Sequence, residues 1–118
     1  MKAHEWLDEF PAAITVCDAE GVIVGMNDRA CATFETDGGA ALIGTNVLAC
    51  HLEPARTKLA ELLRSGSPNV YTIEKGGIKK LIFQSPWFIK GVYSGFVELS
   101  LPLPSVLPHF NRDAKGSD

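Results

Sequence analysis

The sequence lacks any uninterrupted apolar run of the roughly 20 residues that a membrane-spanning helix needs. Its first residues include His4, Glu5, Asp8 and Glu9, where a secretory signal peptide would be apolar. We therefore expect a cytoplasmic protein with no membrane partner. The chain has 118 residues, of which 46% are hydrophobic, and this is enough for one domain with a buried core.

Basic charge is also scarce. The chain has 11 Lys and Arg against 14 Asp and Glu, a net charge of -3, and only the neighbours Lys79 and Lys80 form a short basic pair. Surfaces that bind nucleic acid are strongly basic, because they must neutralise phosphates. We therefore expect no nucleic-acid partner.

Cysteine is too scarce to build a framework. Cys17, Cys31 and Cys50 are odd in number and have no CxxC spacing. A disulfide scaffold requires paired cysteines, and a structural zinc site requires four ligands at short spacings. We expect reduced, buried thiols and no metal site.

What the sequence does contain is a regular order of apolar segments. Trp6, Leu7 and Phe10 recur at helical spacing and Pro11 ends the pattern, which predicts an amphipathic leader helix within residues 1–11. Apolar residues then alternate over 14–17 and 22–26 around a turn at 18–21, which predicts a β-hairpin. Asn27 follows at once, and its side chain can cap the start of a helix.

The rest of the chain predicts a helical stretch followed by strands. Glycines break residues 40–50 into short helical turns, and residues 54–65 form the longest helix, which Gly66 ends. Three strands follow at 69–75, 79–89 and 92–101, and the short links at Gly76-Gly77 and Lys90-Gly91 force antiparallel neighbours. Residues 12–102 are thus one domain, and 103–118 form a Pro-rich, then polar, partly disordered tail.

This order of elements predicts an α+β fold with a five-stranded antiparallel sheet and helices on one face. The segment "AITVCDAEGVIVGMNDRACATF" resembles the opening hairpin, Asn and first helix of the PAS domain, a sensory module of many bacterial signalling proteins. "LIGTNVLACHLEPARTKLAELL" resembles the stretch that leads into its long helix, and "GVYSGFVELS" resembles its last strand. The resemblance spans residues 7–101 and implies ligand or cofactor sensing coupled to dimerisation or to a signalling partner.

The resemblance also helps to weigh cofactors. In the light-sensing LOV branch of the family, a cysteine follows the Asn of a "G-x-N-C" motif and bonds to flavin, whereas Val47 follows Asn46 here, so we expect no covalent flavin. Haem-binding members commonly use a histidine of the long helix, and residues 54–65 contain none. His51 lies just before that helix, where we expect it to bond a backbone carbonyl or a carboxylate, so haem is not expected.

Catalysis finds little support in the sequence. Cys50 and His51 are adjacent, so their side chains point in different directions, and neither an orienting carboxylate nor an oxyanion hole is visible. The glycine pairs at 38–39 and 76–77 lack the spacing of a phosphate-binding loop. We therefore expect a non-catalytic module.

The expected binding site is a pocket between the helices and the sheet, whose ligand the sequence does not name. Polar strand residues such as Gln84 and Thr72 can orient a ligand there. The alternative is a filled core, which predicts a pure protein-interaction module, and a third reading is a haem sensor that uses His51. The candidate pocket residues are Phe34, Leu42, Ile43, Leu48, His51, Leu59, Leu62, Tyr71, Phe83 and Ser85.

The last predicted strand carries apolar residues on both faces, so the face without helices needs a cover. The leader helix can provide this cover in its own chain or against a second chain. We expect a homodimer that acts in signal transduction or transcription regulation. The interface candidates are Trp6, Leu7, Phe10, Val92 and Phe96.

Overall fold

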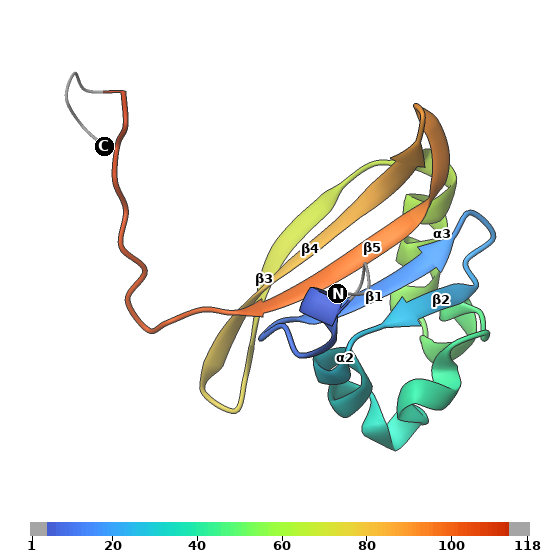
Figure 1. The fold of residues 1–118 in the computed structure, drawn as a ribbon, viewed down its shortest axis with the longest axis horizontal. Coiled ribbons are helices and arrows are strands. Elements are labelled where there is room, and N and C mark those ends of the chain that lie inside the picture. The colour runs from blue at the N-terminus through green and yellow to red at the C-terminus, as the bar shows by residue number, and fades with distance from the viewer. Residues whose placement is uncertain (1–4, 114–118) are drawn as a thin grey trace.

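The computed structural model of this chain describes residues 5–113, apart from the side chain of Cys50. These residues form a five-stranded antiparallel sheet with the strand order β2-β1-β5-β4-β3 (Figure 1). The strands are β1 (Ala13–Asp18), β2 (Ile23–Met26), β3 (Asn69–Lys75), β4 (Ile78–Ile89) and β5 (Val92–Pro102). The α-helices are α1 (Glu5–Asp8), α2 (Asp28–Thr33) and α3 (Ala55–Ser65), and the 3-10 turns are η1 (Glu35–Asp37), η2 (Gly39–Leu42) and η3 (Val47–Cys50). The predicted α+β fold class is confirmed.

The β1–β2 hairpin turns where the sequence predicts it. The Asp18 Oδ1 atom accepts the N–H groups of Glu20 at 3.0 Å and of Val22 at 2.9 Å. Gly21 adopts φ 87°, a left-handed conformation that side chains with a Cβ disfavour. Asp18 and Gly21 together therefore reverse the chain within four residues.

Asn27 joins three segments of the fold. Its side-chain oxygen accepts the N–H of Ala30 at 3.1 Å, which caps α2 as predicted, and the N–H of Ile14 at 2.9 Å. Its side-chain nitrogen donates to the carbonyl oxygens of Leu7 at 3.2 Å and Ala12 at 2.8 Å. With 1% exposure, this one polar side chain links α2, β1 and the leader segment inside the fold.

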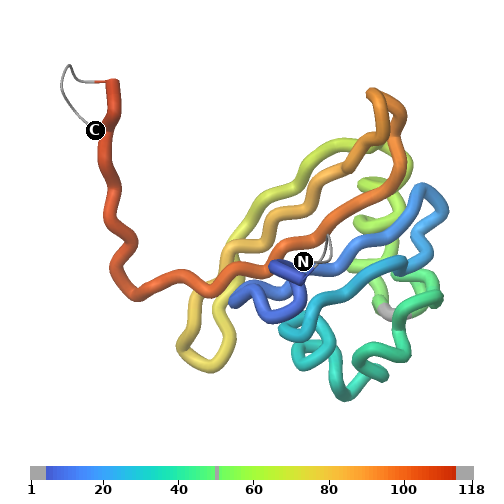
Figure 2. The backbone as a smooth tube through the Cα atoms, viewed as in Figure 1, coloured from blue at the N-terminus to red at the C-terminus, as the bar shows by residue number. Residues whose placement is uncertain are grey.

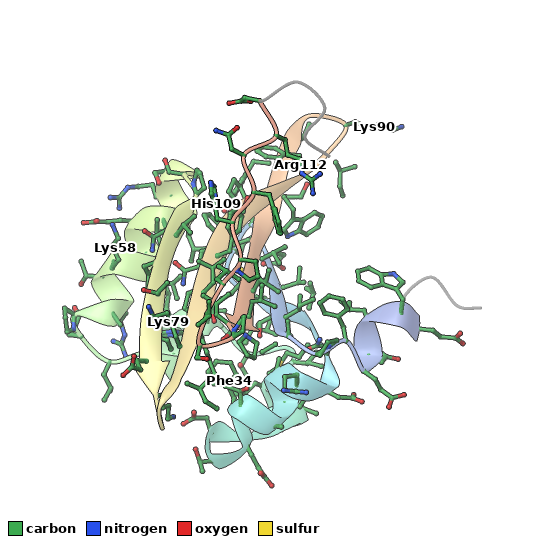
Figure 3. The ribbon with its side chains drawn as sticks, turned by 90° about the vertical axis from the view of Figure 1, so that its left-hand side faces the viewer. Phe34, Lys58, Lys79, Lys90, His109 and Arg112 are labelled. Atoms are coloured by element: carbon green, nitrogen blue, oxygen red, sulfur yellow. The ribbon has the colours of Figure 1, made fainter. Side chains whose placement is uncertain are left out.

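The helical layer covers one side of the sheet. Figures 1 and 3 show α3 on that side and α1 on the opposite side, at one corner of the sheet. Leu62 is the buried residue of α3, and Gly66 ends the helix at φ 65° with its N–H donated to the Leu62 carbonyl at 2.9 Å. The helix therefore stops where the sequence predicts.

An irregularity near the start of β5 redirects its side chains. Trp87 of β4 pairs with Gly95 of β5, but the next residue, Phe88, pairs with Tyr93. Ser94 is thus an extra residue on β5, and a bulge of this kind shifts the alternation of side chains. Tyr93 consequently lies beside the buried Phe96 ring, with ring centroids 6.4 Å apart.

Gly95 makes room for a contact across three strands. The Trp87 indole Nε1 donates to the Cys17 carbonyl oxygen at 3.0 Å, although β5 lies between β4 and β1. A Cβ atom at Gly95 would collide with that carbonyl oxygen and lie 2.7 Å from the indole nitrogen. This close approach requires glycine at position 95.

The two ends of the chain differ from the domain between them. The leader helix α1 has four residues, fewer than predicted, and Trp6 within it is 59% exposed. Residues 103–113 contain neither helix nor strand and extend away from the sheet (Figure 2). Residues 1–4, including His4, and residues 114–118 lie outside the described residues.

Candidate functional site

A cavity of about 70 Å³ lies between the sheet and the helical layer. Its walls come from β1, β2, β4, β5, the end of α2, η2, η3 and α3, so segments far apart in the sequence meet there. Most of the wall is apolar, since it includes Cys17, Ile23, Met26, Phe34, Leu42, Val47, Leu59 and Phe96. The cavity is therefore an apolar chamber that the fold assembles from most of its elements.

A packed cluster supports one side of this cavity. Cys17, Leu62 and Phe96 are each at most 6% exposed and contact one another. Leu63 and Tyr93 pack against this cluster, and the Tyr93 hydroxyl donates to the Leu63 carbonyl at 3.0 Å. One side of the site thus rests on buried core residues.

Burial changes the ionisation of two groups in this region. It raises the pKa of the Cys17 thiol, the backbone hydrogen bond with Phe96 opposes the rise, and the nearby charge of Asp18 adds to it. Burial also raises the pKa of Tyr93, with a smaller contribution from Cys17. Both side chains are therefore more strongly favoured in their neutral forms.

The polar part of the wall is a short chain of hydrogen bonds across three strands. Gln84 Nε2 donates to Glu98 Oε2 at 2.7 Å, and Asn69 Nδ2 donates to Gln84 Oε1 at 2.9 Å. Thr15 on β1 pairs with Glu98 in register and also lines the cavity. A ligand in the apolar chamber would therefore meet a carboxylate at one edge.

His51 also lines the cavity, at the end of η3. Its Nδ1 lies 2.7 Å from the Val47 carbonyl oxygen, and because a carbonyl can only accept, Nδ1 is the donor of this hydrogen bond. Arg56 Nε donates to the His51 carbonyl at 3.2 Å and to the Leu48 carbonyl at 3.1 Å. The histidine is thus anchored at two points, because its ring donates to the Val47 carbonyl and its own main-chain carbonyl accepts from the Arg56 guanidinium.

The structure separates the ten pocket candidates into two groups. Phe34, Leu42, His51 and Leu59 line the cavity, and Leu62 lies in the cluster behind it. The other five are not among the lining residues, and they are Ile43, Leu48, Tyr71, Phe83 and Ser85. Ile43 and Tyr71 are 45% and 43% exposed. Phe83 is 41% exposed because it alternates on β4 with the cavity-lining Gln84 and therefore faces the opposite side of the sheet.

Sequence reasoning missed several lining residues on the strands. Thr15, Cys17 and Ile23 come from the opening hairpin, and Phe96 and Glu98 come from β5. The two-residue period places these β1 and β5 residues on common faces, but it does not say which face the helices cover. The pairing register supplies that information, because it sets Cys17 opposite Phe96 and Thr15 opposite Glu98.

The dimer-interface candidates also divide. Trp6, Phe10 and Val92 are 59%, 39% and 67% exposed, and Leu7 is half-buried. Phe96 is 5% exposed and lines the cavity, which corrects the expectation that it is available to a second chain. The shifted alternation near the start of β5 explains why its position was misjudged.

Residues 5–113 contain no group of three His, Cys, Asp or Glu side chains that is arranged to hold a metal ion. None of their helices has the length and apolar character to cross a membrane.

Several solved structures are similar to this chain. A C-terminal domain from Streptococcus mutans has 20% identity and a TM-score of 0.66, over 80% of this chain and 78% of that one. The PAS domain of an HTR-like protein from Haloarcula marismortui has 17% identity and a TM-score of 0.58, over 83% and 86%. The Aer2 receptor from Vibrio cholerae, described as a dual PAS-heme oxygen sensor, has 18% identity and a TM-score of 0.56, over 79% and 95%.

No family model and no curated protein matches the sequence. The fold is nevertheless clear, because two of the similar structures are PAS domains and each matches most of this chain. The chain has a PAS-like fold, and the resemblance seen in its sequence motifs is confirmed at the level of the fold.

Proposed function

We propose that this chain is a non-catalytic sensory module for signal transduction or transcription regulation, which binds a small molecule between its helices and its sheet. The observation that carries this proposal is the apolar cavity, whose walls come from both layers of the domain. A ligand there would contact strands and helices together. Its binding would favour one packing of the helices on the sheet over another, which is the basis of a population shift.

The size of the cavity limits the ligand. Its volume of about 70 Å³ is several times the roughly 10–15 Å³ that one water requires, but far below the roughly 300–1,000 Å³ of pockets for drug-sized molecules. The site suits a molecule no larger than about one ring. Haem does not fit a cavity of this size, although His51 lines it.

Native mass spectrometry of the purified chain tests the proposal directly. We expect a mass increment from a co-purified small molecule, which identifies the ligand by weight. Leu42→Trp places a large side chain into the cavity and should remove the increment. Ile43→Trp is the matched control, because Ile43 is 45% exposed, is adjacent in sequence and does not line the cavity.

Two results would contradict ligand sensing. One is a bare mass even after exposure to cell extract, and the other is an increment that persists in a folded Leu42→Trp variant. Either result would favour the alternative of a pure protein-interaction module. Folding of both variants is checked by circular dichroism before the masses are compared.

We also propose that the module acts as a homodimer through the sheet face opposite α3. Support comes from apolar side chains that remain exposed on that side of the sheet, such as Phe83 at 41% and Val70 at 52%. The helix α1, with the exposed Trp6, lies at a corner on the same side (Figure 3). A dimer would bury this surface and place the leader helix at the contact. Changes of helix packing inside one copy would then reach its partner.

A further inference from the structure

The charge of Glu98 restricts the chemistry of the ligand, and this inference rests on the proposed function. Glu98 is a half-buried residue in the middle of β5, in register with Thr15 on one side and Gln84 on the other. All three residues line the cavity. The carboxylate therefore belongs to the wall that a bound molecule would touch.

The neighbours of Glu98 orient it but do not neutralise it. Gln84 is 9% exposed and holds the carboxylate with a 2.7 Å hydrogen bond from Nε2. Asn69 donates to Gln84 Oε1 at 2.9 Å, which keeps the amide nitrogen of Gln84 directed at Glu98. Both partners are neutral amides, so they bring no positive charge to the site.

No cation within residues 5–113 pairs with this carboxylate. The hydrogen bond from Gln84 is the polar contact that Glu98 makes there, and it forms no ion pair with a Lys, Arg or His side chain of these residues. His51 lines the same cavity, but its Nδ1 is directed at the Val47 carbonyl oxygen. Closing an apolar ligand over the site would therefore remove water from an unpaired negative charge, which is costly.

The aromatic part of the wall favours the same class of ligand. Phe34 and Phe96 both line the cavity, and the faces of such rings attract cations. The charge of Glu98 also acts on Tyr71. Burial raises the pKa of Tyr71, and the negative charge of Glu98 raises it further. A carboxylate together with aromatic rings in an otherwise apolar chamber suits a cation with an apolar body.

We propose that the ligand is a small organic cation, an amine that carries about one ring or a short branched chain, and that Glu98 is the residue that selects its charge. The ammonium group would bind the Glu98 carboxylate. The apolar body would occupy the space between Ile23, Leu42 and Phe96.

Three probes of nearly the same shape test the charge preference. Benzylamine is cationic at pH 7, benzyl alcohol is neutral and benzoate is anionic. Each is titrated into the 118-residue chain while amide resonances of cavity residues such as Ile23 and Phe96 are followed by NMR. We expect benzylamine to bind at least about tenfold more tightly than benzyl alcohol, as a charge-assisted contact would give, and benzoate not to bind.

Glu98→Gln then assigns the preference to one residue. Glutamine keeps the shape of the side chain and can still accept the hydrogen bond from Gln84, so benzylamine and benzyl alcohol should bind the variant within about twofold of each other. Glu74→Gln is the matched control, because Glu74 is exposed on β3 and does not line the cavity. It should keep the preference of the unmodified chain.

The outcomes separate this inference from the proposed function. If benzyl alcohol or benzoate binds the unmodified chain as tightly as benzylamine, the ligand is not selected by charge, while ligand sensing stands. A preference that survives in Glu98→Gln also overturns the role of Glu98. If none of the three probes shifts the cavity resonances, the inference of a ring-sized organic cation fails, while the native mass measurement still decides whether the cavity binds another small molecule.

Discussion

The two faces of the sheet differ in how far their apolar side chains are buried. On the face that carries α3, Cys17 and Phe96 are 4% and 5% exposed and pack against the helical layer. On the opposite face, Phe83 and Val70 pair across β4 and β3, yet they remain 41% and 52% exposed. One face packs against helices of the same chain, while among residues 5–113 the helix α1 lies over one corner of the other face (Figure 3).

This difference suggests separate roles for the two faces, ligand binding on the covered face and association on the open face. The covered face holds the cavity, and its polar groups are satisfied by hydrogen bonds such as those of Asn27 and Gln84. The open face instead offers exposed apolar side chains such as Phe83 and Val70. Substitutions on the covered face should therefore change folding and ligand binding, and substitutions on the open face should change association.

The largest effect on stability is expected at Gly95, where the Trp87 indole reaches the Cys17 carbonyl across β5. Gly95→Ala would set a Cβ against the Cys17 carbonyl and the Trp87 indole, at φ 149°, so we expect a loss of about 4 kcal/mol or more in the free energy of unfolding. Gly25→Ala is the control, because a Cβ there meets nothing within 4 Å. Urea denaturation measures both, and a small loss for Gly95→Ala would show that β5 can relax away from Trp87.

The next largest effect is expected at Asn27. Asn27→Ala removes the cap of α2 and leaves four buried or partly buried backbone groups without their partner, which should cost about 3 kcal/mol. Asn111→Ala, in the exposed tail, should change stability by less than about 0.5 kcal/mol. If thermal unfolding shows equal effects for the two variants, water replaces the Asn27 contacts and the covered face is less tightly closed than its burial indicates.

These two residues also mark how far the sequence predicts the fold. Asn27 was expected to begin a helix because its side chain, the preceding strand and the following apolar residues are all local in sequence. The strands, the long helix and its end at Gly66 follow from the same kind of local pattern. The additional contacts of Asn27 with Leu7 and Ala12 are set by tertiary packing, and no local pattern contains them.

The candidate site was predicted less completely, because a cavity depends on register and on which face is covered. Phe34, Leu42 and Leu59 were found from helical and turn patterns that point inward. Phe83 was misplaced by one strand position, since its neighbour Gln84 is the residue that lines the cavity. Phe96 was assigned to the wrong role, because the bulge at Ser94 breaks the alternation that was used to orient β5.

A smaller, pH-dependent effect on the free energy of unfolding is expected from Cys17 on the covered face. Burial raises the pKa of Cys17 above its ordinary value of 9.0, so the unfolded chain loses this proton first and stability falls as the pH rises above about 9 toward the folded-state pKa. The pKa values of Tyr71 and Tyr93 are raised from 10.0, so their contributions begin at higher pH. The window from pH 9 to 10 therefore reports mainly on Cys17 among these three groups.

Cys17→Ala should flatten the decline of the unfolding free energy across this window, whatever its cost at pH 7. Thermal melts at pH 7, 9 and 10 measure the slope. Cys31→Ala provides the comparison, since Cys31 is a half-buried cysteine outside the cavity wall. An unchanged slope in Cys17→Ala would show that the thiol is hydrated in the folded chain and that the covered face admits water.

The smallest effect on folding, and the clearest on association, is expected on the open side at Trp6. Its indole is 59% exposed and stacks edge-on against Phe10 at 6.1 Å, so Trp6→Ala should change the free energy of unfolding by less than about 0.5 kcal/mol. An exposed aromatic that becomes buried between two copies dominates an interface, and its loss should raise the dimer dissociation constant about tenfold or more. Val106→Ala, at a tail residue that is 78% exposed, should leave that constant unchanged. Sedimentation velocity over a concentration series measures both variants, and an unmodified chain that stays monomeric throughout would mean that the open face awaits a different protein.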